Sequence, residues 1–341
     1  MRKISILVIT VLLFTACKPK FPIRPTFYFW RTIYKNEKAE TSYLRHFKAK
    51  SMYVRIMDVD INSDTQEPVP VSPVNFDDAL PQQIDVIPVV YLVNNIFNNL
   101  SEAQSKLLAN RISKFVSAKV NQAGKNDYHE LQIDCDWTKS TRDKYFYFLN
   151  QLKLLPSLKG KEISVTLRLH QVKNLVSSGI PPVKKVMLMC YNMGNLRKYG
   201  EQNSILNIED MQTYLKEKLG SYPLKMDVAL PLFSWAVVFR KEKYAGISKR
   251  LSKPELSDKK LFKRRGNSIM YDLLVDYPKA GLRQGDLVRW EEISQDDLLA
   301  TSKFLSRHLK PEERNLVFYH LDTDLLKTFK YDDLQKVIDN F

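Results

Sequence analysis

The stretch Glu130-Leu131-Gln132-Ile133-Asp134-Cys135-Asp136 is a short, mostly apolar run that ends on two carboxylates. A run of this length that is rich in apolar and β-branched residues predicts a buried strand. Similar runs occur at 27–31, 52–58, 86–93, 162–169, 185–191, 226–233 and 315–321. They are nearly continuous in hydrophobicity rather than alternating, which is typical of parallel strands covered on both faces.

Helical patterns lie between several of these runs, at 37–48, 101–120, 141–155, 208–219, 295–309 and 332–340, with Ser101 as an expected N-cap. Eight strands alternating with helices over about 300 residues predict an α/β fold, the (β/α)8 TIM barrel. Two links depart from the pattern. Residues 60–85 are Pro-rich without a clear helix, and 235–295 form a long basic insertion between strands seven and eight.

The alternative fold is an open, doubly wound sheet. It is less favoured because no glycine-rich phosphate turn follows any of the strands. We therefore predict a single TIM-barrel domain over 27–341, preceded by a Pro- and Lys-rich tether over 17–26.

The first sixteen residues predict a secretory signal. Arg2 and Lys3 precede an apolar run that is too short to span a bilayer. The stretch Leu13-Phe14-Thr15-Ala16-Cys17 resembles a bacterial lipobox with an atypical Phe14, which implies cleavage before Cys17 and lipidation of its thiol. We expect a lipid-anchored protein of the bacterial cell envelope, at the outer membrane and facing the periplasm. The alternative is a secreted protein with an unmodified Cys17.

Composition excludes several classes of protein. The 341 residues include only three cysteines and carry a net charge of +15. A disulfide-stapled mini-domain, a polytopic membrane protein and a disordered chain are therefore not expected. Loss of the signal leaves +13, concentrated in the tether and the insertion. That charge indicates either a solvated surface or an anionic partner such as phospholipid or lipopolysaccharide. Nucleic acid is not an expected partner, because no binding motif is present.

Polar and aromatic residues recur at the carboxyl ends of the predicted strands, where barrels carry their catalytic groups. Asp134 and Asp136 are two apart and point to the same face of a strand. Close carboxylates raise one another's pKa, so that one of them can act as a general acid. Alternatively, one caps the following turn and the other pairs with Arg168. Further candidate ligand-binding residues at these ends are Trp30, Asp58, Asp60, Trp137, Arg168, His170, Asn192, Trp235, His320 and Asp322.

Aromatic residues gather at the same predicted rim, namely Tyr28, Trp30, Tyr91, Trp137, Tyr191, Trp235 and Tyr319. Aromatic faces stack on sugar rings while carboxylates bind the hydroxyl groups, so a carbohydrate is the expected partner. The alternative is an aromatic belt within the core. No metal-ligand spacing, nucleophile elbow or P-loop occurs, and neither a metal nor a cofactor is expected.

Three stretches resemble, in order, the motifs of chitinase-like glycoside hydrolases. Residues 131–138 resemble the fourth-strand motif Asp-x-x-Asp-x-Asp-x-Glu, 187–192 the sixth-strand Met-x-Tyr-Asp segment, and 227–233 the seventh-strand segment. The resemblance implies catalytic roles for Asp134, Asp136 and Tyr191. Thr138 occupies the place of the proton-donating Glu, so another acid must serve (Asp136, Asp60, Asp322 or Glu130) or the barrel only binds glycan.

The whole chain also resembles a family of uncharacterised bacterial lipoproteins that share the Phe-Tyr-Phe-Trp start and the Gln-Ile-Asp-Cys-Asp-Trp core. That resemblance implies fold and compartment but no activity. Two functions remain open. One is a glycoside hydrolase-like envelope lipoprotein acting on or binding a glycan at the C-terminal face of the barrel. The other is a non-catalytic glycan-binding or structural lipoprotein with a basic, membrane-facing insertion.

Overall fold

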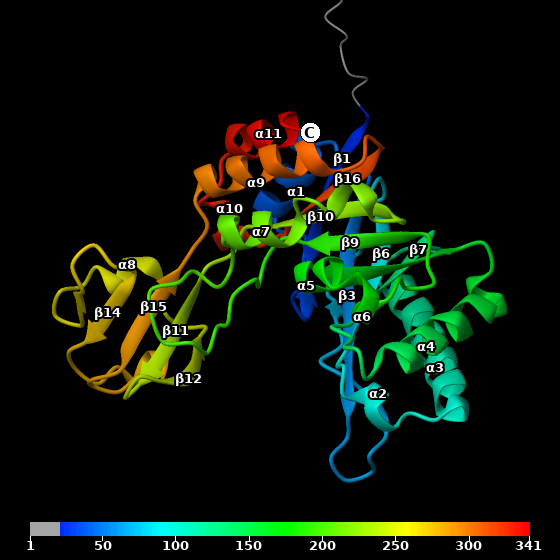
Figure 1. Ribbon diagram of the computed structural model, residues 1–341, viewed down its shortest axis with the longest axis horizontal. Coiled ribbons are helices and arrows are strands. Elements are labelled where there is room, and N and C mark those ends of the chain that lie inside the picture. The colour runs from blue at the N-terminus through cyan, green and yellow to red at the C-terminus, as the bar shows by residue number, and fades with distance from the viewer. Residues whose placement is uncertain (1–20) are drawn as a thin grey trace, which may run out of the picture.

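The computed structural model describes residues 21–341, so the expected signal peptide and Cys17 lie outside the described residues. Eight parallel strands form the barrel (Figure 1): β1 (Ile23–Phe29), β3 (Ser51–Ile61), β6 (Asp85–Leu92), β7 (Glu130–Asp134), β8 (Glu162–Arg168), β9 (Lys185–Met189), β10 (Lys225–Pro231) and β16 (Arg314–Tyr319). They pair in the order β1-β16-β10-β9-β8-β7-β6-β3, and β1 also pairs with β3, which closes the ring. The predicted TIM barrel is confirmed.

Helices surround the strands: α1 (Lys38–His46), α2 (Ile96–Asn99), α3 (Glu102–Gln122), α4 (Arg142–Leu154), α5 (Leu169–Lys173), α6 (Leu175–Ser178), α7 (Ile208–Leu215), α9 (Gln295–His308), α10 (Thr323–Leu326) and α11 (Tyr331–Asp339). Helix α3 begins after Ser101, whose hydroxyl accepts a hydrogen bond from the Gln104 amide in a capping box. Within residues 21–341, no helix has both the length and the apolar composition that a membrane crossing requires.

The barrel begins earlier than the sequence predicts. Strand β1 starts at Ile23 and pairs with β16 from Arg314 onward, so residues 23–26 belong to the barrel rather than to the tether. Thr26 is buried in this part of the strand, and its hydroxyl donates to the Ser51 carbonyl. The sequence does not predict a strand here because the polar and proline residues do not resemble one.

The Pro-rich link contains short strands instead of a helix. Strand β3 extends beyond the ring and pairs antiparallel with β4 (Pro68–Val71), while β5 (Asn75–Phe76) pairs with β2 (Ile33–Tyr34). This agrees with the absence of a helical pattern over 60–85.

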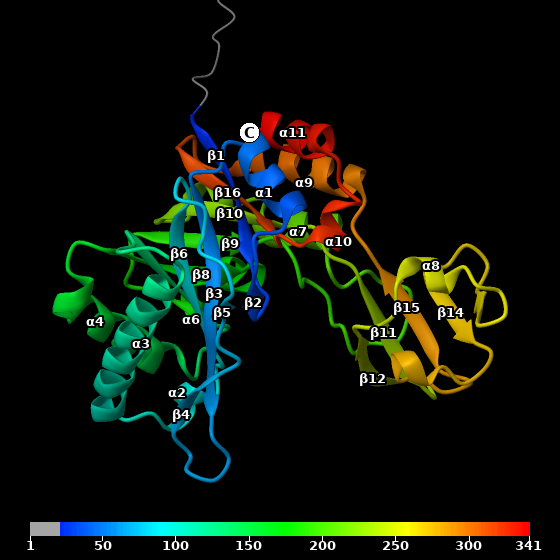
Figure 2. The ribbon, with the colours of Figure 1, turned by 180° about the vertical axis from the view of Figure 1, so that it is seen from behind.

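The insertion folds as a small antiparallel sheet beside the barrel (Figures 1 and 2). It comprises β11 (Trp235–Arg240), β12 (Lys243–Ser248), α8 (Lys253–Leu256), β13 (Phe262–Arg264), β14 (Met270–Leu273) and β15 (Leu287–Glu291). The strand order is β12-β11-β15-β14-β13. It buries an apolar cluster of its own between α8 and the sheet, including Leu256, Phe262 and Val288.

Arg289 and Glu291 of β15 form a buried ion pair, and both residues also bind the loop that follows β9. Arg289 donates to Glu291 at 2.6 Å and to the carbonyls of Leu196, Lys198 and Gly200. The other Glu291 oxygen accepts from the Ser204 amide and hydroxyl, both at 2.6 Å. The insertion thereby fixes the loop whose first residues reach the carboxyl ends of the barrel strands.

Candidate functional site

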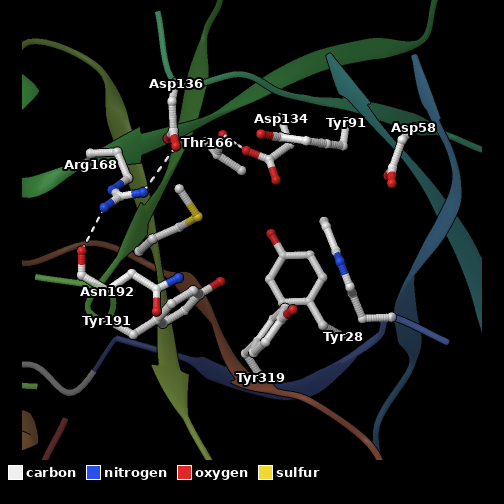
Figure 3. Close-up of a pocket in the computed structure, with 12 residues that line it drawn as sticks. Tyr28, Asp58, Tyr91, Asp134, Asp136, Thr166, Arg168, Tyr191, Asn192 and Tyr319 are labelled. Carbon is white, nitrogen blue, oxygen red and sulfur yellow. Dashed lines mark hydrogen bonds and ion pairs between the residues drawn. The ribbon is translucent and has the colours of Figure 1, made fainter. Parts of the chain in front are cut away.

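A cavity of about 250 Å³ opens at the carboxyl ends of the barrel strands (Figure 3). Seven strands or their following loops contribute its walls, which are formed by Tyr28, Trp30, Asp58, Tyr91, Asp134, Asp136, Thr166, Arg168, Met189, Tyr191, Asn192 and Tyr319. Figure 3 shows the three carboxylates on one side and the rings of Tyr28, Tyr191 and Tyr319 on the other. The volume lies just below the range of about 300–1,000 Å³ typical of small-molecule sites.

Asp134, the last residue of β7, lies deepest among the acids and is 7% exposed. One carboxylate oxygen accepts a 2.5 Å hydrogen bond from the Thr166 hydroxyl. Burial and the nearby Asp136 charge raise the pKa of Asp134 to about 7, against the opposing effects of Thr166 and Arg168. Its carboxyl is therefore partly protonated at neutral pH and can donate or accept a hydrogen bond.

Asp136 lies just beyond β7 and is held by Arg168, whose guanidinium donates to one carboxylate oxygen at 3.0 Å. The same guanidinium donates to the Asn192 carbonyl at 2.5 Å, which links the ends of β7, β8 and β9. The second oxygen of Asp136 and the side-chain oxygen of Asn192 are buried and have no hydrogen-bond partner within residues 21–341. Both are acceptors available to a ligand.

Asp58 is fixed by Arg55 through two contacts, of 2.6 and 2.5 Å. Arg55 itself is almost fully buried and also donates to the Ser72 carbonyl. Since Asp58 and Asp136 each have an arginine partner, Asp134 is the acid of the cavity without one.

The aromatic wall consists of packed rings rather than isolated ones. Tyr28 contacts Trp30 and Tyr319 with ring centroids 5.7 Å apart in each case, and Tyr191 stacks on Tyr319 at 4.9 Å. The Tyr28 hydroxyl donates to the Gln132 side chain below the cavity. This packing holds the rings in place, and Trp30 is half-buried at the opening.

Several residues predicted at the strand ends do not line the cavity. The Asp60 carboxylate accepts from the Ile61 amide, and the His170 side chain is exposed on α5. The Trp235 indole donates to Glu291 at the base of the insertion, at 3.0 Å. These positions correct the expectation that all strand ends converge on one site, because side chains in the connecting loops also turn outward.

His320 and Asp322 form a separate group beside the cavity. Asp322 caps α10 through the amides of Asp324 and Leu325, and it lies 3.7 Å from Arg31. Burial lowers the pKa of His320 to about 4, so the imidazole is neutral, and neither residue lines the cavity. The structure therefore places neither residue at the cavity where ligand binding was expected, and it gives Asp322 a capping contact to α10.

The structure corrects the expectation that Trp137 contacts a ligand. Its indole is 1% exposed, stacks on Tyr145 at 5.2 Å and donates to the Ser178 carbonyl at 2.8 Å. It belongs to the core beneath α4 instead of contacting a sugar. Thr138, at the position of the expected proton donor, is exposed, its hydroxyl lies 2.9 Å from that of Ser140, and it does not line the cavity.

Three residues that form or support the cavity were not predicted from the sequence. Thr166 and Met189 line the cavity from β8 and β9, and Arg55 orients Asp58 from within β3. Thr166 carries a usable signal, because it lies two residues before Arg168 on the same strand and therefore faces the same side. An arginine inside an otherwise apolar strand is likewise a signal of a buried partner.

The described residues contain no group of three or more His, Cys, Asp or Glu side chains placed to hold a metal ion. The polar groups that the cavity offers to a ligand include the carboxyl of Asp134, the fixed carboxylates and the tyrosine hydroxyls. Such a set can bind a polyhydroxylated ring and exchange a proton with it.

The sequence matches no protein-family model and no curated protein. Solved structures are similar over nearly the whole chain. The spore cortex-lytic enzyme SleL of Bacillus cereus gives a TM-score of 0.53 at 14% identity, covering 95% of this chain and 75% of that one. A chitinase of Chromobacterium violaceum gives 0.50 at 12% identity, covering 93% and 98%.

SleL of Bacillus megaterium is similar as well, with a TM-score of 0.51 at 13% identity and coverage of 95% of this chain and 75% of that one. At these identities the likeness establishes the fold alone. The chain shares the (β/α)8 barrel fold with these enzymes.

Proposed function

We propose that this protein binds a glycan in the cavity at the C-terminal face of its barrel and that it lacks chitinase-type cleavage. The main support for this proposal is the composition of the cavity, in which a wall of packed aromatic rings faces three carboxylates. Aromatic faces take the apolar side of a sugar ring, and the free acceptors of Asp136 and Asn192 take its hydroxyl or amide protons.

Cleavage is disfavoured by the arrangement of the acids. Two carboxyl groups flank the scissile bond in most glycosidases, and one must donate a proton to the leaving group. Here Thr138 stands at the donor position and does not line the cavity, while Asp58 and Asp136 are neutralised by arginine. Binding requires no donor and fits the geometry better.

Binding and cleavage are separated by one pair of assays on the same oligosaccharides. Chito-oligosaccharides and peptidoglycan fragments are titrated calorimetrically, and reducing ends are then counted after prolonged incubation. We expect saturable binding without product. Trp30→Ala should weaken binding about tenfold or more, since stacked rings contribute substantially to contact energies. His170→Ala, at an exposed residue outside the cavity, serves as the matched control and should bind as the wild type does.

A second candidate is hydrolysis with Asp134 as the acid. The observation in its favour is that the pKa of Asp134 is raised to about 7, as a proton donor requires at neutral pH. Release of reducing ends that disappears in Asp134→Asn but persists in His170→Ala would establish this function and replace the binding proposal.

We further propose that the chain is anchored in the bacterial envelope through a lipid on Cys17, with the periplasm as its compartment. Support comes from the lipobox-like stretch 13–17. Radiolabelled palmitate should enter the protein in cells, and Cys17→Ser should abolish the label and release the protein from the membrane fraction. Labelling that persists in Cys17→Ser would contradict the assignment.

A further inference from the structure

The barrel cavity offers hydrogen-bond acceptors around Asp134 without matching donors. One oxygen of Asp134 accepts from Thr166, and the other has no hydrogen-bond partner within residues 21–341. The Tyr28 hydroxyl gives its only proton to the Gln132 side chain, so its oxygen faces a ligand as an acceptor. Burial and then the Asp134 charge raise the pKa of Tyr28, which shows that the two groups lie close together. A ligand group placed between them must supply the protons.

Asp134 also lacks a counter-charge. Arg168 is the one cation among residues 21–341 that lines the cavity, and its guanidinium binds Asp136 and the Asn192 carbonyl. Figure 3 shows Arg168 at one end of the cavity, Asp58 at the other and Asp134 between them. Asp58 has its own partner, since it is paired with the buried Arg55 outside the cavity wall.

The aromatic wall opposite the acids is suited to a positive charge. Trp30 contacts both Tyr28 and Tyr319, with ring centroids 5.7 and 5.5 Å apart, and Tyr191 stacks on Tyr319. Ring faces attract a cation, and the attraction is stronger where water is displaced. Acceptors, an acid without a cation and aromatic rings thus surround the same space.

We propose that the cavity takes an amino sugar through its free, protonated amine, which lies between the Asp134 carboxylate, the Tyr28 hydroxyl and the aromatic wall. The inference rests on the proposed glycan binding and names the class of sugar. An ammonium group carries three N–H donors, whereas a hydroxyl or an acetamide carries one. It therefore satisfies several acceptors at once and forms a charge-assisted hydrogen bond with the acid.

A metal ion is the competing cation, and the geometry does not favour it. Within residues 21–341, no three acidic, histidine or cysteine side chains are placed to hold one. The acids of the cavity are spread along its wall instead. An amine on a sugar ring fits this spread better, because the ring hydroxyls also reach the free oxygens of Asp136 and Asn192.

Binding of an ammonium group has a measurable consequence for the proton on Asp134. Burial and the nearby Asp136 charge raise the pKa of Asp134 to about 7, with Arg168 opposing and Asp58 adding to the rise. Burial raises the pKa of every tyrosine in the wall, so these hydroxyls stay neutral: Tyr28, Tyr91, Tyr191 and Tyr319. A positive charge within hydrogen-bond distance lowers the pKa of a carboxyl by about 1 to 3 units. Asp134 should therefore release its proton when the amine binds.

The test compares three disaccharides by calorimetric titration of the purified protein at about pH 5.5. They are β-1,4-linked glucosamine disaccharide, its di-N-acetyl form and cellobiose. Salt of about 0.15 M screens charges more than about 8 Å away. The glucosamine disaccharide should bind about tenfold or more tightly than the other two, as a charge-assisted hydrogen bond implies. Repeating the titration in buffers of different ionisation enthalpy should show release of about half a proton or more per site for glucosamine and none for the acetylated form.

Two variants locate the amine. Asp134→Asn should lower the affinity for the glucosamine disaccharide to that for the acetylated one and abolish the proton release. Its affinity for the acetylated disaccharide should stay within about threefold of the wild type. Asp60→Asn is the matched control, because Asp60 lies near the carboxyl end of β3, accepts from the Ile61 amide and does not line the cavity. It should behave as the wild type does.

The outcomes separate this inference from the proposed function on which it rests. If none of the three disaccharides binds, glycan binding itself fails, and the inference fails with it. If all three bind equally, glycan binding stands and the preference for an amine is overturned. Tighter binding of glucosamine that persists in Asp134→Asn, or that occurs without proton release, would place the amine elsewhere and overturn the inference as well.

Discussion

Replacing Asp134 by Asn should remove a specific pH dependence from the stability of the fold. The pKa of this carboxyl rises from 3.8 to about 7 on folding, mainly because of burial. The folded protein therefore keeps a proton that the unfolded chain releases above about pH 4. Because the folded state binds more protons in this window, its stability falls as the pH rises toward 7 and is constant again above that.

The size of the effect follows from the same values. One pKa unit corresponds to about 1.36 kcal/mol, so the free energy of unfolding falls by about 4 kcal/mol over the whole range between the two pKa values. About 2 to 3 kcal/mol of this loss falls between pH 5 and pH 8. Asn resembles the protonated acid in shape and retains an oxygen that accepts from Thr166. Asp134→Asn should therefore be the more stable form at pH 8 and similar to the wild type at pH 4.

Urea unfolding of both proteins at pH 4, 5 and 8 measures this difference. Other titrating groups contribute equally to both chains and cancel when the two curves are subtracted. If the unfolding free energies of the two proteins change equally from pH 4 to pH 8, the reasoning is refuted. That result would mean that Asp134 is ionised in the folded protein.

Three further outcomes are expected. Arg168→Gln removes a charge that lowers the pKa of Asp134, so the stability loss attributed to Asp134 should move to higher pH, as urea unfolding would show. Trp137→Ala leaves a large void in the core and should cost about 3 to 5 kcal/mol in unfolding free energy, with glycan affinity unchanged when measured well below the new Tm. Glu291→Gln leaves Arg289 buried without its ion pair and should cost about 3 to 5 kcal/mol by the same unfolding measurement; a cost below 1 kcal/mol would contradict the buried pair.

The barrel could be predicted from sequence because its strands are nearly continuous apolar runs, and because parallel strands place their carboxyl ends on one face. Asp58, Asp134, Asp136 and Tyr191, which the sequence places at these ends, line one cavity in the structure. The start of β1 could not be predicted, because polar and proline residues around Thr26 do not resemble a strand.

Residues just beyond a strand end were the main source of error, since their side chains turn with the loop. Trp137 follows Asp136 directly and yet enters the core beneath α4. The Arg289–Glu291 pair could not be predicted from the sequence for a different reason. Its partners Leu196 and Ser204 are some ninety residues away along the chain, and only the folded insertion brings them into contact.

The central claim is that the barrel cavity takes a sugar ring between its aromatic wall and its carboxylates. Calorimetric titration of chito-oligosaccharides into the wild type, Trp30→Ala and Asp136→Asn tests it most directly. The account predicts saturable binding to the wild type that is weakened about tenfold or more in both variants. Absence of binding to the wild type, or equal affinity in all three proteins, would contradict it.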